Sequence, residues 1–255
     1  MLPKERQEII LKKIDEEGIV YLSELTKELQ ASTCTIRRDF DKLESDHLVK
    51  RIHGGAVKVQ DTEHILEMTK LNMDTRMTMH PEEKRALCQE IARLVKDDDC
   101  IFIDGGTTFM YVMDYLQNKN VIVVSHNCLL KNDDTYRSKL YVLGGLHSSK
   151  YQMNLEPMTI DDLRYFHFDK VFIGAAGFTL EDQNIYTAEI ETAKVKQQAM
   201  KQGKKKYLVI DSEKIGMYGF YTMANLKDMD GLITTQNIMS LQDKLILASN
   251  LESRK

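Results

Sequence analysis

A Gly-Gly-Thr-Thr turn is the first feature of this sequence whose residue types could do chemistry. It follows the apolar run Ile101–Asp104 and precedes a segment with helical periodicity, Thr108–Gln117. Glycine lets the backbone approach a ligand closely, unpaired N–H groups at a helix start attract anions, and threonine hydroxyls add donors. The turn lacks the Lys-Ser/Thr pair of a Walker loop and the third glycine of the dinucleotide fingerprint. It is therefore either an ordinary tight turn or a phosphate site made of Asp104, Gly105, Gly106, Thr107 and Thr108.

Polar or glycine residues also end four later apolar runs. Ligands of open parallel sheets bind beyond the carboxyl ends of the strands, so we expect these residues to line one cleft. Glu191 and Lys196 lie near the start of the helix that follows the fourth run, about 140° apart, so at most one faces the cleft. His126 is either a ligand-binding side chain or a surface histidine with satisfied hydrogen bonds. The further candidate effector residues are Ser125, His126, Asn127, Gly144, Gly145, Gly174, Glu191, Lys196 and Lys214.

A second candidate site lies on a short helix near the N-terminus, which starts at Thr33 and runs to about Ser45. At about 100° per residue, Ile36, Phe40 and Leu43 share one face, which must be buried. The opposite face carries an arginine among small or hydroxylated side chains. A helix that enters the DNA major groove needs such a face, because small side chains allow close approach and arginine can fork onto guanine. The expected contacts are Ser32, Thr33, Cys34, Thr35, Arg37, Arg38 and Lys42.

The segment after this helix, Leu48–Val57, predicts a β-hairpin with its turn at Gly54-Gly55. Lys50, Arg51 and His53 are then placed to meet DNA phosphates. A plain three-helix bundle with solvated charges is the alternative. Residues 1–57 hold ten Lys and Arg against eleven Asp and Glu, so overall charge does not decide between the two.

Two domains would position these residues: a winged helix-turn-helix over 1–57 and an α/β domain over 80–255, joined by a polar linker over 58–79. The first domain has helices at Lys4–Glu17, from Ser23 as N-cap, and from Ser32 as N-cap, with an extended piece at Ile19–Tyr21. In the second, apolar runs without polar alternation alternate with helices, which predicts a mainly parallel sheet covered on both faces. The expected strands are Ile101–Asp104, Val121–Ser125, Leu140–Leu143, Lys170–Ile173, Lys206–Asp211 and Leu232–Thr234, and the expected helices Glu82–Lys96, Thr108–Gln117, Met158–Tyr165 and Glu189–Lys201.

Composition excludes several classes of protein. The 255 residues are 42% hydrophobic and 29% charged, with a net charge of -4, as in ordinary globular proteins. No apolar run approaches the roughly 20 residues of a membrane span, and the N-terminus has no signal-peptide pattern. The four cysteines are far apart and form no CxxC pair, so neither a zinc site nor a disulfide framework is expected. We therefore expect a cytoplasmic protein with reduced thiols, no metal, no cofactor and no membrane contact.

The stretch ASTCTIRRDFDKLESDHLVKRIHGGAV closely resembles the signature of the DeoR family of bacterial repressors of sugar metabolism. Ala31 and Phe40 replace the family's usual Val and Leu, and both changes keep the position apolar. The resemblance covers about 50 residues and implies a DNA-reading helix followed by a wing. The matching positions are Ser32, Thr35, Ile36, Arg37, Arg38, Asp39, Leu43, Arg51, His53, Gly54, Gly55 and Ala56.

The second half resembles the effector domain of the same family, which is related to ribose-5-phosphate isomerase and glucosamine-6-phosphate deaminase. The resemblance implies a phosphorylated-sugar effector. Three departures stand out: Ser125-His126-Asn127 replaces Thr-Asn-Ser, Phe109 replaces a third Thr and is expected to pack on the sheet, and Glu156 replaces a Gly before Pro157. The matching positions are Asp104, Gly106, Thr107, Thr108, Gly144, Gly145, Asp169, Phe172, Gly174, Gly177, Glu191, Lys196, Ala199, Met200, Asp211, Ser212, Lys214 and Gly216.

Three functions remain open from sequence. The first is a repressor that binds operator DNA as a homodimer or homotetramer and releases it when a phosphorylated sugar binds. The second is a sugar-phosphate isomerase or deaminase with an accessory helical domain, for which Asp104 and Glu191 are the available carboxylate bases. The third is an activator, because the sign of regulation depends on where the operator lies. The N-terminal signature favours the repressor, since an isomerase has no use for it.

Overall fold

A computed structural model describes residues 3–17, 19–46, 48–52, 55–58, 73–219 and 221–249. The chain divides into two compact units, Met1–Lys70 and Leu71–Lys255. Each unit has its own hydrophobic core.

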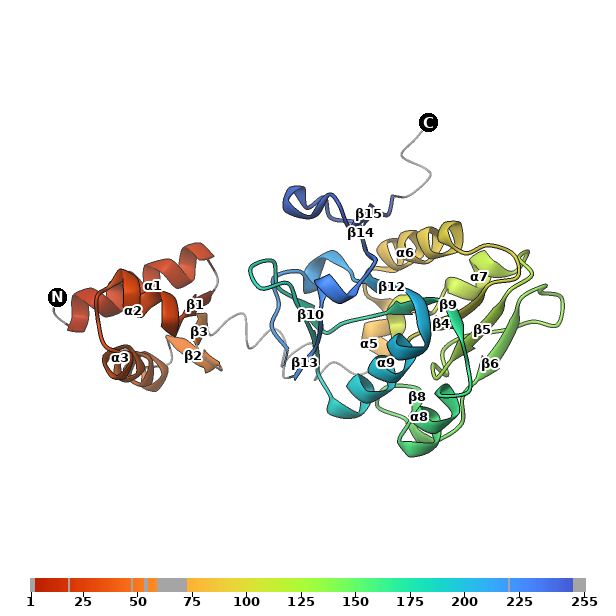
Figure 1. Ribbon diagram of the computed structural model, residues 1–255, viewed down its shortest axis with the longest axis horizontal. Coiled ribbons are helices and arrows are strands. Elements are labelled where there is room, and N and C mark those ends of the chain that lie inside the picture. The colour runs from red at the N-terminus through yellow and green to blue at the C-terminus, as the bar shows by residue number, and fades with distance from the viewer. Residues whose placement is uncertain are drawn as a thin grey trace. The chain divides into compact units, whose positions relative to one another are not determined.

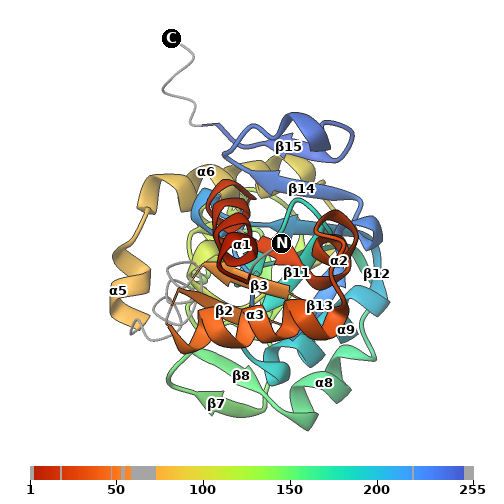
Figure 2. The same cartoon turned by 90° about the vertical axis from the view of Figure 1, so that its left-hand side faces the viewer.

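The N-terminal unit is a three-helix domain with a small antiparallel sheet (Figure 2). Its helices are α1 (Pro3–Glu17), α2 (Leu22–Glu28) and α3 (Thr33–Ser45), and its strands are β1 (Ile19–Tyr21), β2 (Val49–Ile52) and β3 (Gly55–Lys58). Strand β3 lies between β1 and β2, so the predicted hairpin is confirmed and is extended by the segment before α2. This is a winged helix-turn-helix.

One of the two predicted N-caps in this unit is confirmed. The Ser32 side chain accepts a hydrogen bond from the Thr35 N–H at 3.1 Å. The Ser23 cap is wrong, because α2 already begins at Leu22 and has Tyr21 as its N-cap. Tyr21 is the last residue of β1, so strand pairing sets the point where the helix starts, and the local serine signal does not. In the predicted turn, Gly55 opens β3 and Gly54 lies outside the described residues.

The C-terminal unit is built on a seven-stranded sheet whose strands are all parallel (Figure 1). Helices α6 (Pro81–Leu94) and α7 (Val112–Leu116) cover one face, and α8 (Pro157–Leu163) and α9 (Ile190–Gln202) cover the other. The predicted doubly covered parallel sheet is confirmed. In spatial order the strands are β15 (Leu245–Leu247), β14 (Gly231–Thr234), β12 (Gly203–Val209), β9 (Phe168–Ile173), β4 (Cys100–Ile103), β5 (Ile122–Ser125) and β6 (Lys139–Val142).

This order brings together the strand ends that carry the candidate residues. Strands β12, β9, β4, β5 and β6 are consecutive neighbours. Because parallel strands share one carboxyl edge, the five polar turns that follow them lie along the same edge of the sheet.

The predicted helix Thr108–Gln117 is wrong as a single element. The chain first makes a short 3-10 turn, η1 (Thr107–Phe109), and only then the five residues of α7. Two adjacent β-branched threonines have low helix propensity. Phe109 is fully buried between α6 and the sheet, as predicted. The Gly-Gly-Thr-Thr turn therefore does not open onto a long helix, and the helix dipole adds little there.

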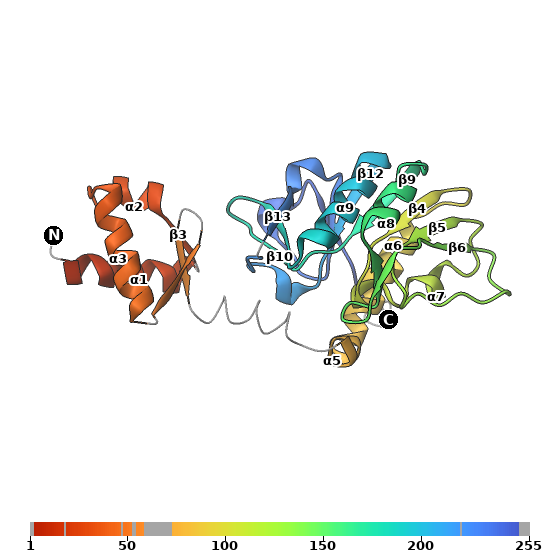
Figure 3. The ribbon, with the colours of Figure 1, turned by 90° about the horizontal axis from the view of Figure 1, so that it is seen from below.

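Several short elements escaped prediction. The hairpin β7 (Leu146–Ser148) and β8 (Met153–Leu155) follows the Gly144-Gly145 turn, and α5 (Met73–Thr78) lies within the segment assigned to the linker. A small sheet of β10 (Gly177–Phe178), β11 (Asn184–Thr187) and β13 (Tyr221–Asn225) contacts α9 through β11 and β13 (Figure 3). Short 3-10 turns follow β12, β13 and β14: η2 (Ser212–Lys214), η3 (Leu226–Asp228) and η4 (Met239–Leu241).

Candidate functional sites

Helix α3 presents the face that its sequence predicted. Ile36, Phe40 and Leu43 are at most 2% exposed and pack into the core of the N-terminal unit. The candidate DNA contacts Ser32, Thr33, Cys34, Arg37, Arg38 and Lys42 are exposed, and Thr35 is half-buried. The Ser32 and Thr35 hydroxyls lie 2.8 Å apart, and Lys42 pairs with Asp46 at 2.6 Å along the helix. Arg37 and Arg38 are exposed, and neither forms an ion pair with another described residue.

The wing supplies the remaining candidate DNA contacts. Lys50 and Arg51 lie on β2, whose backbone pairs with β3. His53 lies outside the described residues. The proposed phosphate contacts of this wing remain predictions.

A buried ion pair between Arg6 and Asp39, which was not predicted from the sequence, holds α3 against α1. Arg6 Nε binds Asp39 Oδ2, and Arg6 Nη2 donates to Asp39 Oδ1 at 3.1 Å. The hydrogen bond with Asp39 raises the pKa of Arg6. The signal was present, because Asp39 lies three residues after Ile36 and therefore close to its buried face. A two-pronged arginine–carboxylate contact restricts orientation, so this pair sets the angle at which α3 is presented.

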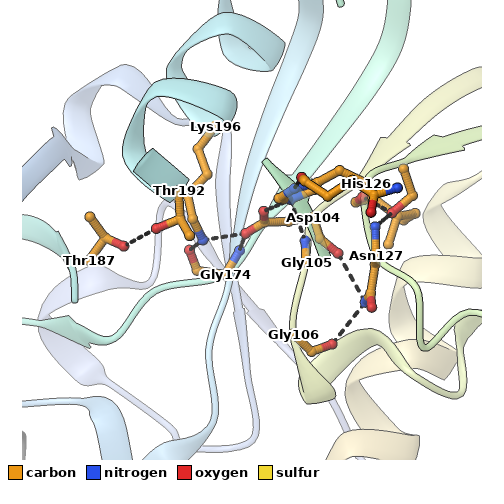
Figure 4. Close-up of polar contacts among 12 residues, drawn as sticks. Asp104, Gly105, Gly106, His126, Asn127, Gly174, Thr187, Thr192 and Lys196 are labelled. Atoms are coloured by element: carbon orange, nitrogen blue, oxygen red, sulfur yellow. Dashed lines mark hydrogen bonds and ion pairs between the residues drawn. The ribbon is translucent and has the colours of Figure 1, made fainter. Parts of the chain in front are cut away.

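Asp104, which directly follows β4, is the centre of the candidate site in the C-terminal unit (Figure 4). It is fully buried. Its Oδ2 accepts the Gly174 N–H at 2.8 Å and forms an ion pair with Lys196 Nζ, while its Oδ1 lies 3.1 Å from His126 Nε2. Burial by itself raises the pKa of Asp104, but the charge of Lys196 and the bond with His126 outweigh it and bring the pKa to about 2. The carboxylate therefore stays ionised at neutral pH.

Lys196 reaches this network from α9. Its side chain is 9% exposed, and Nζ also donates to the Gly174 carbonyl at 2.9 Å. Glu191 lies on the exposed part of the same helix. Of the two candidates on this helix, Lys196 contacts Asp104, whereas Glu191 is exposed and its role in effector binding stays a prediction.

His126 is fully buried, so its interpretation as a surface histidine is wrong. Nδ1 lies 2.9 Å from the carbonyl oxygen of Asn154, an acceptor, and therefore carries a proton. In the neutral ring Nε2 accepts the Gly105 N–H at 3.0 Å, and in the protonated ring it donates to Asp104. Asn154, on β8, escaped notice because only tertiary pairing of the hairpin with the end of β5 brings it there.

The residues around His126 brace the glycine turn. The Asn127 amide donates to the Gly106 carbonyl at 2.9 Å, and the Ser125 hydroxyl donates to the Ile103 carbonyl at 2.7 Å. Gly106 has a φ of +108°, and a Cβ at this position would meet no atom within 4 Å. Packing therefore does not explain the glycine, and the space beside its backbone is open to a ligand. Thr107 and Thr108 are less than 10% exposed.

Two further candidates have local partners. Gly145 has a φ of +137° and is pressed against Leu155 and Thr159, whose hydroxyl donates to the Gly144 carbonyl at 2.6 Å. Lys214 pairs with Asp211 at 2.5 Å. These residues lie at the carboxyl edge of the sheet, but none of them hydrogen bonds to Asp104.

Comparison with known proteins identifies both units. Residues 79–236 match the DeoR C terminal sensor domain, and residues 6–62 match the DeoR-like helix-turn-helix domain. The chain belongs to the DeoR family of transcriptional regulators. It is a DeoR-type regulator that binds DNA through its helix-turn-helix and carries a sensor domain. The alternative prediction of a sugar-phosphate isomerase or deaminase is therefore wrong, because this family consists of transcriptional regulators and not of enzymes.

Relatives in the family are similar over almost their whole length. The uncharacterized HTH-type transcriptional regulator FruR of Bacillus subtilis is 32% identical over 92% of both chains. The lactose phosphotransferase system repressor of Streptococcus mutans is 31% identical, also over 92% of both chains. Among solved structures, a D-ribose-5-phosphate isomerase in complex with phospho-erythronic acid matches 52% of this chain and 53% of its own, with 14% identity and a TM-score of 0.38.

The departure from the DeoR pattern at Glu156 has a structural consequence. Glu156 has a φ of 79° and a ψ of -176°, a region that is essentially reserved for glycine. The residue is exposed and is the N-cap of α8. This DeoR regulator therefore holds a strained glutamate where the family pattern has glycine.

No helix in the described part of the chain has the length and apolar character of a membrane span.

Proposed function

We propose that this DeoR regulator represses a carbohydrate-utilisation operon in the cytoplasm and releases its operator when a phosphorylated sugar binds the sensor domain. Residues 1–57 read the operator, residues 58–79 connect the domains, and residues 80–255 bind the effector. An activator would differ from a repressor only in where its operator lies relative to the promoter. A reporter gene under this promoter distinguishes the two, because loss of the protein raises expression if it is a repressor and lowers expression if it is an activator.

The observation that carries the proposal is the open backbone at Gly106 beside the Asp104 network. The network is internally satisfied, so it forms a rigid frame and does not need a ligand to hold it. A Cβ at Gly106 would meet no atom within 4 Å, so there is room for a ligand group beside this frame. Several relatives are repressors of lactose phosphotransferase systems, which supports a sugar operon as the target.

The mechanism follows from linked equilibria. A homodimer or homotetramer places two α3 helices on repeated half-sites of the operator. A sugar phosphate that binds the DNA-incompetent arrangement more tightly shifts the population towards it, and the operator is released.

The direct test is release of the operator by sugars. Purified full-length protein is bound to a fragment of its own promoter region, and phosphorylated sugars are compared with their free counterparts. We expect release by one or a few phosphorylated sugars, together with an increase in the melting temperature of the protein, because a ligand that binds only folded protein stabilises it. Absence of binding to the promoter at low salt would refute the proposal.

A further inference from the structure

One nitrogen of the buried His126 ring faces two groups and can bond to only one of them at a time (Figure 4). Nε2 lies 3.0 Å from the Gly105 amide nitrogen and 3.1 Å from Oδ1 of Asp104. A neutral ring accepts the Gly105 N–H, but its lone pair then also faces a carboxylate oxygen. A protonated ring donates to Asp104, but its N–H then opposes the N–H of Gly105. Each protonation state of His126 therefore makes one of these contacts and gives up the other.

The opposite side of the ring is held in place, so the ring does not turn away from these two groups. Nδ1 lies 2.9 Å from the Asn154 carbonyl oxygen, and the Asn154 N–H donates to the His126 carbonyl at 2.8 Å. The ring also stacks on Phe102, with the two ring centroids 6.0 Å apart. Because Nδ1 keeps its proton on the Asn154 carbonyl, a change of charge on the ring takes place at Nε2.

Gly105 allows the ring to approach the backbone this closely. An ideal Cβ at Gly105 would lie 3.0 Å from Nε2 of His126 and 2.7 Å from Cε of Met153, so a side chain does not fit at this position. Neither Gly105 nor His126 is among the positions that match the DeoR pattern, which has asparagine at the position of His126. The contact between the two residues is therefore particular to this chain and does not follow from the family pattern.

The charged groups beside the ring balance each other only while the ring is neutral. The titratable side chains that contact the ring or its hydrogen-bond partners are Asp104 after β4, Cys128 after β5, His147 on β7 and Lys196 on α9. Cys128 and His147 lie against the side-chain oxygen of Asn154, at 3.5 and 3.3 Å. The charges of Asp104 and Lys196 cancel, so a proton on His126 leaves a positive charge in excess. Such a charge away from water is costly unless an anion lies beside it.

We infer that His126 couples the binding of an anionic effector at the Gly-Gly-Thr-Thr turn to the uptake of a proton, an inference that rests on the proposed function. Protonation transfers the hydrogen bond of Nε2 from Gly105 to Asp104 and releases the Gly105 N–H at the start of the turn. The next residue, Gly106, has open space beside its backbone. Free N–H groups in such a turn attract anions, so the released donor strengthens the site. His126 is thus a positioning residue that acts through the Gly105 amide.

The sign of the coupling follows from linkage. A bound anion favours the protonated ring, and the protonated ring favours the bound anion by the same factor. Histidine is the side chain that ordinarily changes its charge between about pH 5 and 8. Effector affinity therefore rises as pH falls through this range, by at most about tenfold per pH unit for one proton. At a fixed effector concentration, the regulator releases its operator more readily at the lower pH.

The test uses full-length protein and sulfate as the probe, because sulfate keeps both charges between about pH 5.5 and 7, whereas a phosphate ester titrates there. Isothermal titration calorimetry in buffers of different ionisation enthalpy measures the affinity and the number of protons taken up. Wild-type protein is expected to take up as much as about one proton per sulfate and to lose affinity up to about tenfold per pH unit as pH rises.

Two variants show which histidine is responsible. His126→Asn restores the residue of the DeoR pattern and cannot take up a proton, so its sulfate affinity is expected to be the same across this pH range, with no proton uptake. His147→Asn, which removes the exposed histidine next to Asn154, is the matched control and is expected to keep the wild-type slope. A slope that persists in His126→Asn, or that is lost only in His147→Asn, would overturn the inference.

A second measurement reads the ring in the wild-type protein and does not depend on the folding of a variant. Nuclear magnetic resonance with ¹⁵N-labelled histidine reports the protonation of each ring, and the His126 signals are those missing from His126→Asn. Addition of sulfate at about pH 6.5 is expected to increase the protonated fraction of His126. An unchanged fraction, or sulfate that binds no better than chloride at matched ionic strength, would contradict the coupling.

Operator release separates this inference from the proposed function. If a phosphorylated sugar releases the operator from wild type and His126→Asn with the same pH dependence, the inference fails and the proposed function stands. If sulfate binding protonates His126 but no phosphorylated sugar releases the operator, the proposed function fails and the proton-coupled anion site stands.

Discussion

Lys196 and Asp104, 92 residues apart in sequence, form an ion pair in which the two side chains are 9% and 1% exposed. The pair joins α9 to the carboxyl end of β4 and sits beside Gly174 at the end of β9. Removing one member leaves the other buried without its counter-charge, whereas removing both does not.

Lys196→Met and Asp104→Asn are therefore each expected to destabilise the sensor domain by about 3–5 kcal/mol. The double variant should lose less than the sum, because neither charge is then left alone. Urea unfolding of the full chain measures the three values. Lys150→Met, which removes an exposed lysine paired with Glu189, serves as control and should change stability by less than about 1 kcal/mol. Additive losses in the double variant would contradict the coupling.

The ionised state of Asp104 predicts a pH dependence of stability. Its pKa in the folded protein is about 2, below the ordinary value of 3.8, because Lys196 and His126 outweigh the effect of burial. The unfolded chain therefore binds the proton more readily, and the stability contributed by Asp104 is complete above about pH 4 and is lost as pH falls towards 2. Unfolding followed between pH 5 and 2 should show a shallower loss in Asp104→Asn than in the wild type. If the free energy of unfolding falls with pH equally in the wild type and Asp104→Asn, then groups other than Asp104 cause the loss of stability.

Arg38 is exposed on α3 opposite the buried face, where a base edge would lie. Arg38→Ala is expected to weaken operator binding by about 1–3 kcal/mol and to relax sequence preference at one position. Arg51→Ala in the wing should instead weaken binding to all sequences alike and reduce its salt dependence. Fluorescence anisotropy with operator and scrambled DNA at several salt concentrations separates the two. Equal losses on both DNAs for Arg38→Ala would contradict base reading.

Gly106→Asp places a carboxylate at the open backbone where we propose the phosphate binds. Like charges repel, so the variant should bind operator but no longer release it when the phosphorylated sugar is added. Gly106→Ala is the matched control, because it shares the strain of a φ of +108° without the charge. In a reporter strain the aspartate variant should keep the operon repressed in the presence of the sugar. Normal induction of Gly106→Asp would exclude a phosphate at this turn.

Glu156→Gly should stabilise the sensor domain. The glutamate has a φ of 79°, which glycine adopts without strain, and relief of such a conformation amounts to about 1–3 kcal/mol. Asp162→Gly, at an exposed position inside α8, is the control and should cost about 1 kcal/mol, since glycine disfavours a helix interior. Thermal unfolding compares the two. A destabilised Glu156→Gly would mean that the carboxylate makes a contact worth more than the strain.

Features that depend on local periodicity could be predicted from the sequence. The buried face of α3 with Ile36, Phe40 and Leu43 follows from 3.6 residues per turn, and the all-parallel sheet follows from apolar strands that alternate with helices. The Ser32 cap is equally local. The N-cap predicted at Ser23 is wrong because β1 runs directly into α2, so the end of the strand sets the start of the helix.

The contacts between side chains that are distant in sequence depend on the packing of the elements and could not be predicted. The strand order places β4 beside β9 and β5, and this brings Gly174 and His126 to Asp104 although the three are far apart along the chain. The same packing brings Lys196 of α9 to Asp104 and leaves Glu191 exposed. Periodicity reports which face of an element is buried but carries no information about its partner. The charge pairs of this sensor domain, and with them its candidate phosphate site, therefore depend on how the strands and helices are arranged around one sheet.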